Sequence, residues 1–544
     1  MISAGLLEGL RLDLVERRIS SGFRRLDECE AGWRAPDPGC PGSALLVGWL
    51  AQWVDVGYRD FSIVCQALAG FPSSGRACLP LIDYAHLRIA DASLAMSAEE
   101  WGQALRHLDF VLSLGAEIDD PTLVAVAHYW KARTLRQKGE YQQAMEHAAA
   151  GEKVAAGLGH RRMAAVMCVL QSWLMFQRGR ARDAWATLEQ AENALRDTDD
   201  HVVLGNIQSA YGRMLRRQGR YEQAIGRFER SIEEYRLVQP RHRNVARSLA
   251  NMAYVKRLLA LQWRRKIDAD AAGRRKTASV DRERFAQFRA EALEHLREAG
   301  EIYTELMQHH GAGTVRVNSG LLHLDGGDLE LAAVEAESAF DLGREKSDHI
   351  LMARARILQC MIENAKVEEE VERASPHAAL DFAREAVELG KHTENARLLA
   401  RAYLWQGFTL AGEFYKNPEA ARACLDSATA LVRPNGNDPL WADLQELKGK
   451  IVQGGAVDAR LRAWSEGEVG DKTLQQIMEE FAEVVIPKVW EKEERRVARV
   501  AKKLKVSPKK VRRILGSLQK RGALNGRLEP EDAVPTRTGS PSRA

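Results

Sequence analysis

The chain has 544 residues, of which 45% are hydrophobic and 28% charged, and this balance indicates a folded protein and excludes a wholly disordered one. Its length exceeds what one hydrophobic core usually serves, so several units or a repeat array are expected. The net charge of +4 is uneven: residues 495–522 hold 12 of the 79 Lys and Arg residues and no Asp or Glu, which leaves 67 basic against 75 acidic residues elsewhere.

Several classes of protein are excluded by missing motifs. The seven cysteines are scattered and form no C-x-x-C pair, so neither a disulfide framework nor a compact zinc site is expected. The first residues do not resemble a signal peptide, and the most apolar stretch, residues 44–56, is too short to span a bilayer. No phosphate-binding loop and no zinc-protease or hydrolase motif is present. We therefore predict a cytoplasmic protein with reduced thiols that is not an enzyme and binds no metal, cofactor or membrane.

Residues 1–98 show helical patterning that is broken at the Pro- and Gly-containing segment AGWRAPDPGCPG. Pro and Gly interrupt helices because they disturb the backbone hydrogen bonds and torsions that a helix needs. We predict degenerate helical hairpins that form an N-terminal capping region for the segment that follows.

A repeat begins after this region. Four segments align without gaps on alanines spaced 40 residues apart. In three of them a glycine precedes the alanine by five positions, and the same pattern returns after Gly327. Glycine supplies a turn and alanine lets two helices approach closely, so each repeat is predicted to be a helical hairpin whose apolar face only its neighbour can bury. The marker alanines are Ala104, Ala144, Ala184 and Ala224, the turn glycines are Gly139, Gly179 and Gly219, and weaker copies surround Ala292, Ala379 and Ala420.

These hairpins resemble tetratricopeptide (TPR) repeats. The copy from Gly205 to Arg236 matches the family's signature best, and the resemblance covers roughly residues 99–432. The period is 40 residues where the family has 34. The resemblance implies an all-α, TPR-like solenoid over residues 99–453 that binds a protein or peptide. The matching residues are Gly212, Leu215, Gly219, Tyr221, Ala224, Phe228 and Ser231.

One insert interrupts the array. Between the copies at Ala224 and Ala292 the spacing stretches to 68 residues, and the polar segment 264–284 contains a glycine. Such a segment is typical of a surface loop, so we predict a basic loop here. Its Arg274, Arg275 and Lys276 either touch an acidic partner or are simply solvated.

In TPR proteins the first helix of each hairpin lines a concave surface that takes a peptide or helix. Carrying this over by position predicts a partner groove in which arginines stand beside aromatic residues. Guanidinium pairs bidentately with carboxylate or phosphate and stacks on rings, so an acidic or phosphorylated segment would fit. The alternative is that the arginines are solvated ends on buried stems. The predicted groove residues are Tyr129, Arg133, Arg136, Trp173, Phe176, Arg213 and Arg216.

A linker at residues 454–470 is rich in glycine, and a helical apolar stripe follows from Leu474 to Val485. A second helix is predicted over residues 493–504. A third begins at Pro508, because Ser507 is a good N-cap and proline is favoured at the first helical position. We predict a helix-turn-helix domain over residues 471–524 and, because residues 525–544 are rich in Pro, Gly and Ser, a disordered tail.

The third helix would present its basic face outward and lie in the major groove of duplex DNA, where Arg or Lys reads guanine and other cations neutralise phosphates. A solvated basic tail or an RNA-binding arm remains the alternative. The candidate DNA-binding residues are Lys502, Lys505, Ser507, Lys509, Lys510, Arg512 and Arg513.

This segment resembles the Fis-type helix-turn-helix of bacterial enhancer-binding regulators. It departs from that family at Glu494-Arg495-Arg496, where the family has Gly-Gly-Asn, and at Lys505, where the family has the turn glycine. In that family the preceding helix forms a dimer, so the apolar stripe is expected either to form a homodimer or to pack on its own second helix. The matching residues are Phe481, Ile486, Val500, Ala501, Leu504, Val506, Ser507, Val511 and Leu515.

The sequence therefore predicts a transcriptional regulator in which the solenoid docks a protein or peptide and the basic end binds duplex DNA. The alternative is a protein–protein adaptor whose basic end docks an acidic partner.

Overall fold

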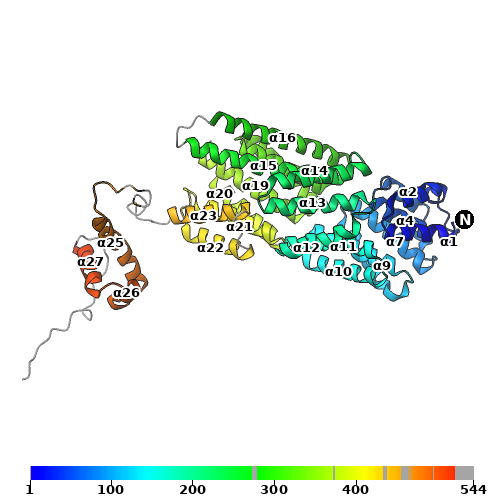
Figure 1. Cartoon of the computed structure of the whole chain (residues 1–544), viewed down its shortest axis with the longest axis horizontal. Coiled ribbons are helices and arrows are strands. Elements are labelled where there is room, and N and C mark those ends of the chain that lie inside the picture. Colours follow the sequence, from blue (N-terminus) through cyan, green and yellow to red (C-terminus); the bar gives the residue numbers. More distant parts are fainter. Residues whose placement is uncertain are drawn as a thin grey trace, which may run out of the picture. The chain divides into compact units, whose positions relative to one another are not determined.

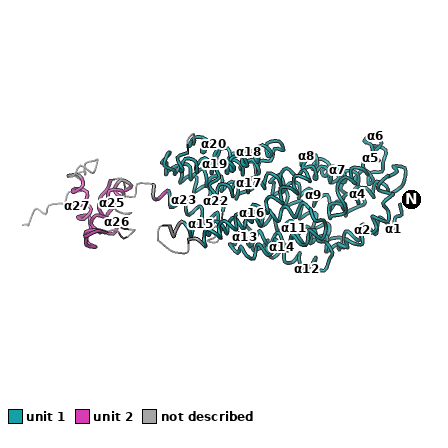
Figure 2. The backbone as a smooth tube through the Cα atoms, turned by 90° about the horizontal axis from the view of Figure 1, so that it is seen from above, with its two compact units in different colours: residues 1–450 teal, residues 451–544 magenta. Residues whose placement is uncertain are grey.

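The computed structural model describes residues 2–271, 278–371, 374–432, 438–454 and 469–520 except 494, together with residues 464 and 467. Helices connected by turns make up the described residues, and no strand occurs among them. The chain divides into two compact units, residues 1–450 and residues 451–544 (Figure 2). The predicted all-α class is therefore confirmed. None of the described helices is long and apolar enough to cross a membrane.

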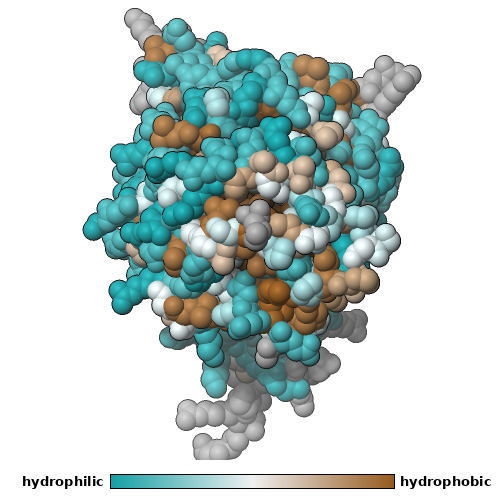
Figure 3. All heavy atoms as spheres, turned by 90° about the vertical axis from the view of Figure 1, so that its right-hand side faces the viewer, coloured by the Kyte–Doolittle hydropathy of each residue, from teal (hydrophilic) through white to brown (hydrophobic). Residues whose placement is uncertain are grey.

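The N-terminal region is helical as predicted. A break at residues 35–42 follows the third of its helices, in the segment where the sequence places its prolines and glycines. Trp33 and Trp53 are fully buried in its core, and Figure 3, which looks at this end of the first unit, shows a mostly hydrophilic surface with smaller hydrophobic areas. The helices are α1 (Ala4–Val15), α2 (Ile19–Glu28), α3 (Glu30–Arg34), α4 (Ser43–Asp55), α5 (Ser62–Ala69) and α6 (Ser73–Arg76).

Paired antiparallel helices then follow one another along the first unit (Figure 1), and each first helix packs on its own second helix and on the next hairpin. The first hairpin already begins at Leu81, so the boundary that we predicted after residue 98 falls inside it. The hairpins are α7 (Leu81–Ser97) with α8 (Trp101–Leu114), α9 (Pro121–Lys138) with α10 (Tyr141–Gly157), α11 (Arg161–Gln177) with α12 (Ala181–Leu195), α13 (His201–Arg217) with α14 (Tyr221–Val238), α15 (Arg243–Ala271) with α16 (Ala278–Glu305), α17 (His309–Asp325) with α18 (Leu329–Glu345), α19 (His349–Glu368) with α20 (Pro376–Lys391), and α21 (Ala396–Ala411) with α22 (Pro418–Leu431).

The turns and contacts of the hairpins follow from the residues that define the repeat. The turn glycines 139, 179, 219 and 327 have φ between 74° and 85°, a left-handed conformation that costs glycine little. The marker alanines 104, 144, 184 and 224 are fully buried. A Cβ atom added at Gly212 would lie 2.8 Å from the ring of Phe228, so α13 and α14 approach closely only because this position lacks a side chain. In the weaker copy that was predicted around Ala420, the buried alanine is Ala421, so the marker position lies one residue later.

The predicted loop at residues 264–284 is wrong in most of its length. Helix α15 continues to Ala271 and α16 starts at Ala278, so this hairpin is longer than the others and not interrupted by a long loop. The polar composition suits two helix ends that extend beyond the body of the repeat, because a helix with few buried contacts needs no apolar stripe. Arg274, Arg275 and Lys276 lie outside the described residues.

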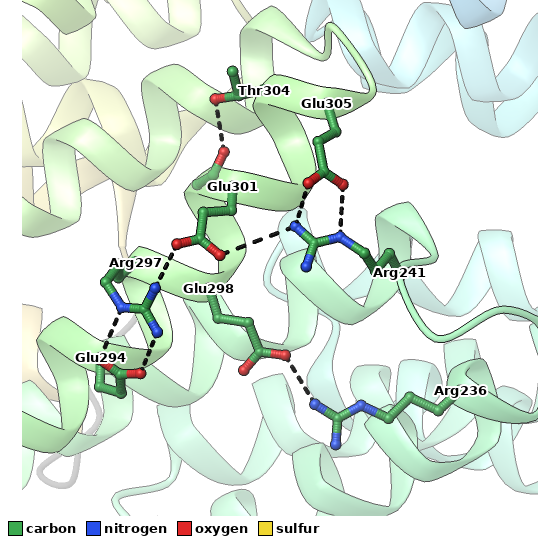
Figure 4. A network of polar contacts seen from close by, with 9 residues as sticks. Arg236, Arg241, Glu294, Arg297, Glu298, Glu301, Thr304 and Glu305 are labelled. Carbon is green, nitrogen blue, oxygen red and sulfur yellow. Dashed lines mark hydrogen bonds and ion pairs between the residues drawn. The ribbon is translucent and has the colours of Figure 1, made fainter.

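Ion pairs connect α16 to the end of α14 and to the segment that follows α14 (Figure 4). Arg236 pairs with Glu298 at 2.9 Å, and Arg241 binds both carboxylate oxygens of Glu305 at 2.6 and 2.7 Å. Arg297 joins Glu294 to Glu301 along α16 itself. Exposed pairs of this kind contribute little individually, so the buried apolar residues between these helices dominate their packing.

Contacts between residues distant in the sequence join hairpins that are not neighbours in the chain. The backbone N–H of Glu394, before α21, donates to the carbonyl of Gly139 at 2.9 Å, and the Glu394 carboxylate accepts from the N–H of Gln142 at 2.6 Å. At the N-terminal end, the Arg17 guanidinium donates to buried Asp200 at 2.6 Å. First helices far apart in the chain are thereby brought near one another.

Helix α23 (Pro439–Gly454) ends the solenoid and runs to the edge of the predicted linker, of which the structure describes only a few residues. The second unit contains α25 (Leu474–Lys492), α26 (Val497–Leu504) and α27 (Pro508–Lys520). The predicted disordered tail at 525–544 lies outside the described residues.

Candidate functional site

Arginines recur on the first helices of the hairpins, and the structure divides them into two groups. One group is paired with carboxylates from distant elements. Arg133 binds Asp55 at 3.0 Å and Arg257 binds Asp325 at 2.5 and 2.9 Å, while Arg397 donates to Asp438 at 2.6 Å. The second group, which we call the arginine cluster, has no carboxylate partner among the described residues and consists of Arg136, Arg213, Arg216, Arg247, Arg354 and Arg401.

The arginine cluster comes from α9, α13, α15, α19 and α21, and its members lie on neutral groups. The Arg216 guanidinium donates to the side-chain oxygen of Asn251 at 3.1 Å and lies 5.0 Å from the ring centre of Tyr254. Arg354 donates to the Thr314 hydroxyl at 3.1 Å. Arg401 donates to the hydroxyl of Tyr254 at 3.2 Å. None of these partners is a carboxylate, so the half-buried guanidinium groups keep positive charge available to a ligand.

Burial and mutual repulsion lower the pKa values of several of these groups. The pKa of Arg136 falls to about 9 because of burial and then because of the charges of Arg247 and Arg133. The pKa of Arg213 falls well below its ordinary value for the same reasons, with Arg247 and Arg136 as the nearby charges. The pKa of Arg216 falls to about 10, mainly through burial. Since burial disfavours an uncompensated charge, the first unit holds a region that an anion would stabilise.

Tyr254 partly compensates the positive charge of the arginine cluster. Burial alone would raise its pKa, but the charges of Arg401, Arg257 and Arg216 lower the pKa to about 7. A phenol shifted this far is ionised in a substantial fraction of molecules near neutral pH. Tyr254 therefore acts as an internal counter-ion for the part of the cluster that surrounds it.

Most of the predicted groove residues lie near the cluster. Tyr129 lies 5.5 Å beneath the Arg133 guanidinium, and Trp173 lies 5.2 Å from that of Arg136. Arg213 and Arg216 belong to the cluster. Arg133, by contrast, is committed to Asp55, which is 78 positions earlier.

Phe176 is a correction. Its side chain is only 3% exposed and packs in the core, where Arg217 covers its ring at 3.7 Å. Phe176 follows Trp173 by three positions, so the two share one side of α11, and their spacing alone did not show that only Trp173 contacts the cluster. A ligand would not reach Phe176.

Sequence reasoning missed Arg247, Arg354, Arg401 and Tyr254. The positional alignment was strong only as far as the hairpin of α13 and α14, because the next hairpin is longer and the later copies are weaker. The available signal was the recurrence of arginine on the later first helices, which does not show whether a carboxylate from another hairpin pairs with it.

The second unit has a small apolar core to which α25, α26 and α27 all contribute. Four of the residues that match the Fis-type pattern, Val500, Ala501, Val511 and Leu515, are buried in it, and Trp490 at the end of α25 is a fully buried residue that the sequence reasoning missed. Only residues 505–507 connect α26 to α27. The core residues are Ile486, Trp490, Val497, Val500, Ala501, Val511, Ile514 and Leu515.

The turn between α26 and α27 has the predicted cap. The Ser507 hydroxyl accepts a hydrogen bond from the N–H of Lys510 at 3.2 Å, as an N-cap does. Lys505 takes a left-handed conformation with φ 51°, and Arg495, in the turn before α26, has φ 61°. Both are positions where such turns ordinarily favour glycine.

The predicted DNA-binding side chains surround α27 and the end of α26. Lys502, Lys505, Ser507, Lys509 and Arg513 are exposed, whereas Lys510 and Arg512 are half-buried. Arg513 also pairs with Glu479 of α25 at 2.9 Å. The face of the unit that α27 presents to solvent is therefore strongly basic.

The first half of α25 is not buried within its own chain. Leu474, Met478 and Phe481 are 74%, 60% and 50% exposed. The later part of α25 packs on the core that α26 and α27 share, with Ile486 inside that core and Ala482 against it.

Comparison with known proteins bears on the fold. No family model matches the chain, and no curated protein matches it in sequence. The structure of a Rap protein complexed with Competence and Sporulation Factor is similar, with a TM-score of 0.51 and 12% identity over 73% of this chain and 99% of that one. Yeast Tom70 gives a TM-score of 0.38 at 11% identity over 86% of this chain and 99% of that one. The likeness to the Rap structure shows the fold: the first unit is a solenoid of TPR-like helical hairpins.

Proposed function

We propose that this protein is a DNA-binding transcriptional regulator: the solenoid docks a protein or peptide partner and the second unit binds duplex DNA through α27. The observation that carries the DNA-binding half is the division of α27 into two faces. Val511, Ile514 and Leu515 are buried, whereas the opposite side carries lysines and arginines. Basic side chains that neutralise phosphates and an exposed helix that fits the major groove are the two requirements of such a reader.

The turn geometry supports the resemblance to Fis-type helix-turn-helix domains. Arg495 and Lys505 have positive φ at positions that correspond to glycines of that family, so the backbone keeps the turns although the residue types differ. Exposed Leu474, Met478 and Phe481 would cover one another in a homodimer. A dimer would place two copies of α27 on two half-sites and raise the affinity of a weakly binding unit.

The ligand of the solenoid is proposed from two observations. The similar Rap structure was solved with Competence and Sporulation Factor, and the arginine cluster offers guanidinium groups without carboxylate partners. An acidic or phosphorylated segment of a partner protein fits these groups.

A mobility-shift experiment tests the proposal. The full chain is incubated with fragments of genomic DNA at low salt, and the expected result is a shift that weakens as salt is added, because binding releases counterions. A chain that ends at Gly470 keeps the solenoid and is expected to lose the shift. Its thermal unfolding serves as the control that the first unit is intact. If the full chain shifts no fragment at low salt, the proposal fails.

A protein–protein adaptor is the second candidate. It is favoured by the ion pairs of Arg513 with Glu479 and of Lys503 with Glu493, which show that carboxylates already bind basic side chains of the second unit. An adaptor captures its partners equally well before and after nuclease treatment of the lysate, whereas a DNA-bound regulator loses those that DNA bridges.

A further inference from the structure

Three arginines of the cluster share one further feature: Arg136 on α9, Arg213 on α13 and Arg247 on α15. In each the Nε atom is buried and has no hydrogen-bond partner. Arg213 makes no hydrogen bond and no ion pair with any residue that the structure describes. A buried donor that finds no acceptor costs free energy, so three such donors in one region call for an explanation.

Two of these three groups contact polar or aromatic side chains and no carboxylate among the described residues. Arg247 donates to the side-chain oxygen of Asn206 at 2.6 Å and to the hydroxyl of Tyr235 at 3.2 Å. Arg136 lies over the ring of Trp173. These neighbours hold two of the guanidiniums in place without neutralising them.

The three charges also act on one another. The charge of Arg247 lowers the pKa values of both Arg136 and Arg213, and the charge of Arg136 lowers the pKa of Arg213. Contacts between the helices place the three groups together. Asp55 binds both Arg133, at 3.0 Å, and Arg243, at 3.5 Å, and Arg136 and Arg247 follow these two arginines by about one helical turn on α9 and α15. Arg216 binds Asn251 at 3.1 Å, and Arg213 and Arg247 precede these two residues by about one turn on α13 and α15. Elsewhere on the same helices the fold does supply carboxylates, as Asp55 does for Arg133. Among the residues that the structure describes, neighbouring arginines thus have carboxylate partners and these three have none.

We propose that Arg136, Arg213 and Arg247 form a binding site for a multiply charged oxyanion, namely a phosphoryl or pyrophosphoryl group. A guanidinium fork binds two oxygens of one phosphate, and an isolated carboxylate with one negative charge would leave two of the three cations uncompensated. A phosphoryl group carries a charge of about −1.5 to −2 at neutral pH, which matches the site better. The inference deepens the proposed function only by naming the chemistry that the solenoid recognises, and it does not depend on DNA binding.

Full-length protein and sodium pyrophosphate test this site. Pyrophosphate is titrated into the protein by calorimetry, and its effect on the unfolding temperature is measured at constant ionic strength. Both experiments use the wild type and the variants Arg213→Gln, Arg247→Gln and Arg230→Gln. Arg230 is exposed on α14, in the same hairpin as Arg213, so its variant has the same change of net charge without touching the site. Loss of an unpaired buried charge should not impair folding, so both site variants are expected to be stable.

The expected result is that pyrophosphate binds and stabilises the wild type and the Arg230 variant, while each site variant binds it at least about tenfold more weakly, since charge-assisted hydrogen bonds are the strong ones. Equal stabilisation of all four proteins would reveal a general salt effect and overturn the proposal, as would the absence of binding.

A phosphoserine peptide and its unphosphorylated form then distinguish a phosphorylated protein segment from a small phosphate compound as the source of the group. Binding of the phosphorylated peptide more tightly than pyrophosphate identifies the segment, and the reverse order identifies the small compound. DNA binding is measured on the same samples. Pyrophosphate binding without any DNA shift removes the proposed function and keeps this site, and a DNA shift without pyrophosphate binding does the opposite.

Discussion

The guanidinium of Arg401 donates a hydrogen bond to the hydroxyl of Tyr254, 3.2 Å away and 147 positions earlier in the chain. The contact joins α21 to α15 and forms because the solenoid brings these first helices together. It also places the Tyr254 phenol close to several positively charged arginines. Their charges lower the pKa of Tyr254 to about 7, although burial acts in the opposite direction.

Ultraviolet titration should therefore detect a phenolate near neutral pH, because the phenolate absorbs at longer wavelength than the phenol. The signal is expected to be present in the wild type and absent in Tyr254→Phe. Tyr58, Tyr211 and Tyr303 are suitable internal contrasts, since burial raises the pKa of each. A titration curve that is identical in the two proteins would contradict the assignment.

Stability should respond to pH through the same residue. The pKa of Tyr254 is about 7 in the folded chain and 10.0 for an ordinary exposed tyrosine, so between these pH values the unfolded chain binds more protons than the folded one and stability rises with pH. The contribution is complete above about pH 10 and is lost as pH falls through 7. The difference in unfolding free energy between wild type and Tyr254→Phe, measured across this range in urea, should follow that sign.

Replacing two glycines of one hairpin by alanine should change the stability of the chain in opposite directions. A Cβ at Gly212 would lie 2.8 Å from the buried ring of Phe228, whereas nothing lies within 4 Å of one at Gly226. Gly226→Ala is expected to stabilise the chain by about 0.5–1 kcal/mol, because glycine is unfavourable inside a helix. Gly212→Ala is expected to destabilise it by about 1–2 kcal/mol, because overpacking outweighs that gain. Equal shifts of the unfolding midpoint would show that α13 and α14 can separate to make room.

Replacing Lys505 by glycine should stabilise the second unit. Lys505 has φ 51° and ψ 39°, a conformation that costs an L-residue about 1–2 kcal/mol, and the greater entropy of glycine in the unfolded chain offsets part of this gain. We expect a net gain of up to about 1 kcal/mol. Amide hydrogen exchange of α26 and α27 in the full chain measures it. Lys502→Gly, in the helical part of α26, is the control that should accelerate exchange.

Exposed apolar residues on α25 should determine the oligomeric state. Met478→Glu and Phe481→Glu are expected to convert a dimer to a monomer, since a charge buried without a partner is costly. Val334→Glu alters a residue of α18 that is 62% exposed and should change nothing. Light scattering after gel filtration gives the masses. A wild type that stays monomeric at every concentration would refute the proposed dimer.

The salt dependence of DNA binding should identify the lysines that contact phosphate. Lys509→Gln is expected to weaken binding to all duplexes and to reduce the slope of log affinity against log salt by about 1. Lys492→Gln removes an exposed charge from α25 and should leave the slope unchanged. If the two variants have equal slopes, Lys509 makes no phosphate contact.

The local features of this protein could be predicted from the sequence because each depends on residues close together in the chain. The glycine turn at Gly219 and the buried marker Ala224 repeat at a fixed spacing, and the cap at Ser507 depends on the next three residues. The extension of α15 was missed because a polar helix without an apolar stripe has the composition of a loop.

The pairing of the arginines was decided only by the tertiary structure. Arg133 and Arg213 look equivalent in the repeat, yet Asp55 neutralises the first from another element, and the second has no carboxylate partner in the part of the chain that the structure describes. The superhelical path of the solenoid determines which distant side chains meet, and small differences in hairpin length accumulate along it. Whether an arginine is a structural ion pair or a candidate ligand group is therefore a property of the assembled solenoid, because charge acts across space and repeat spacing describes only neighbours in the chain.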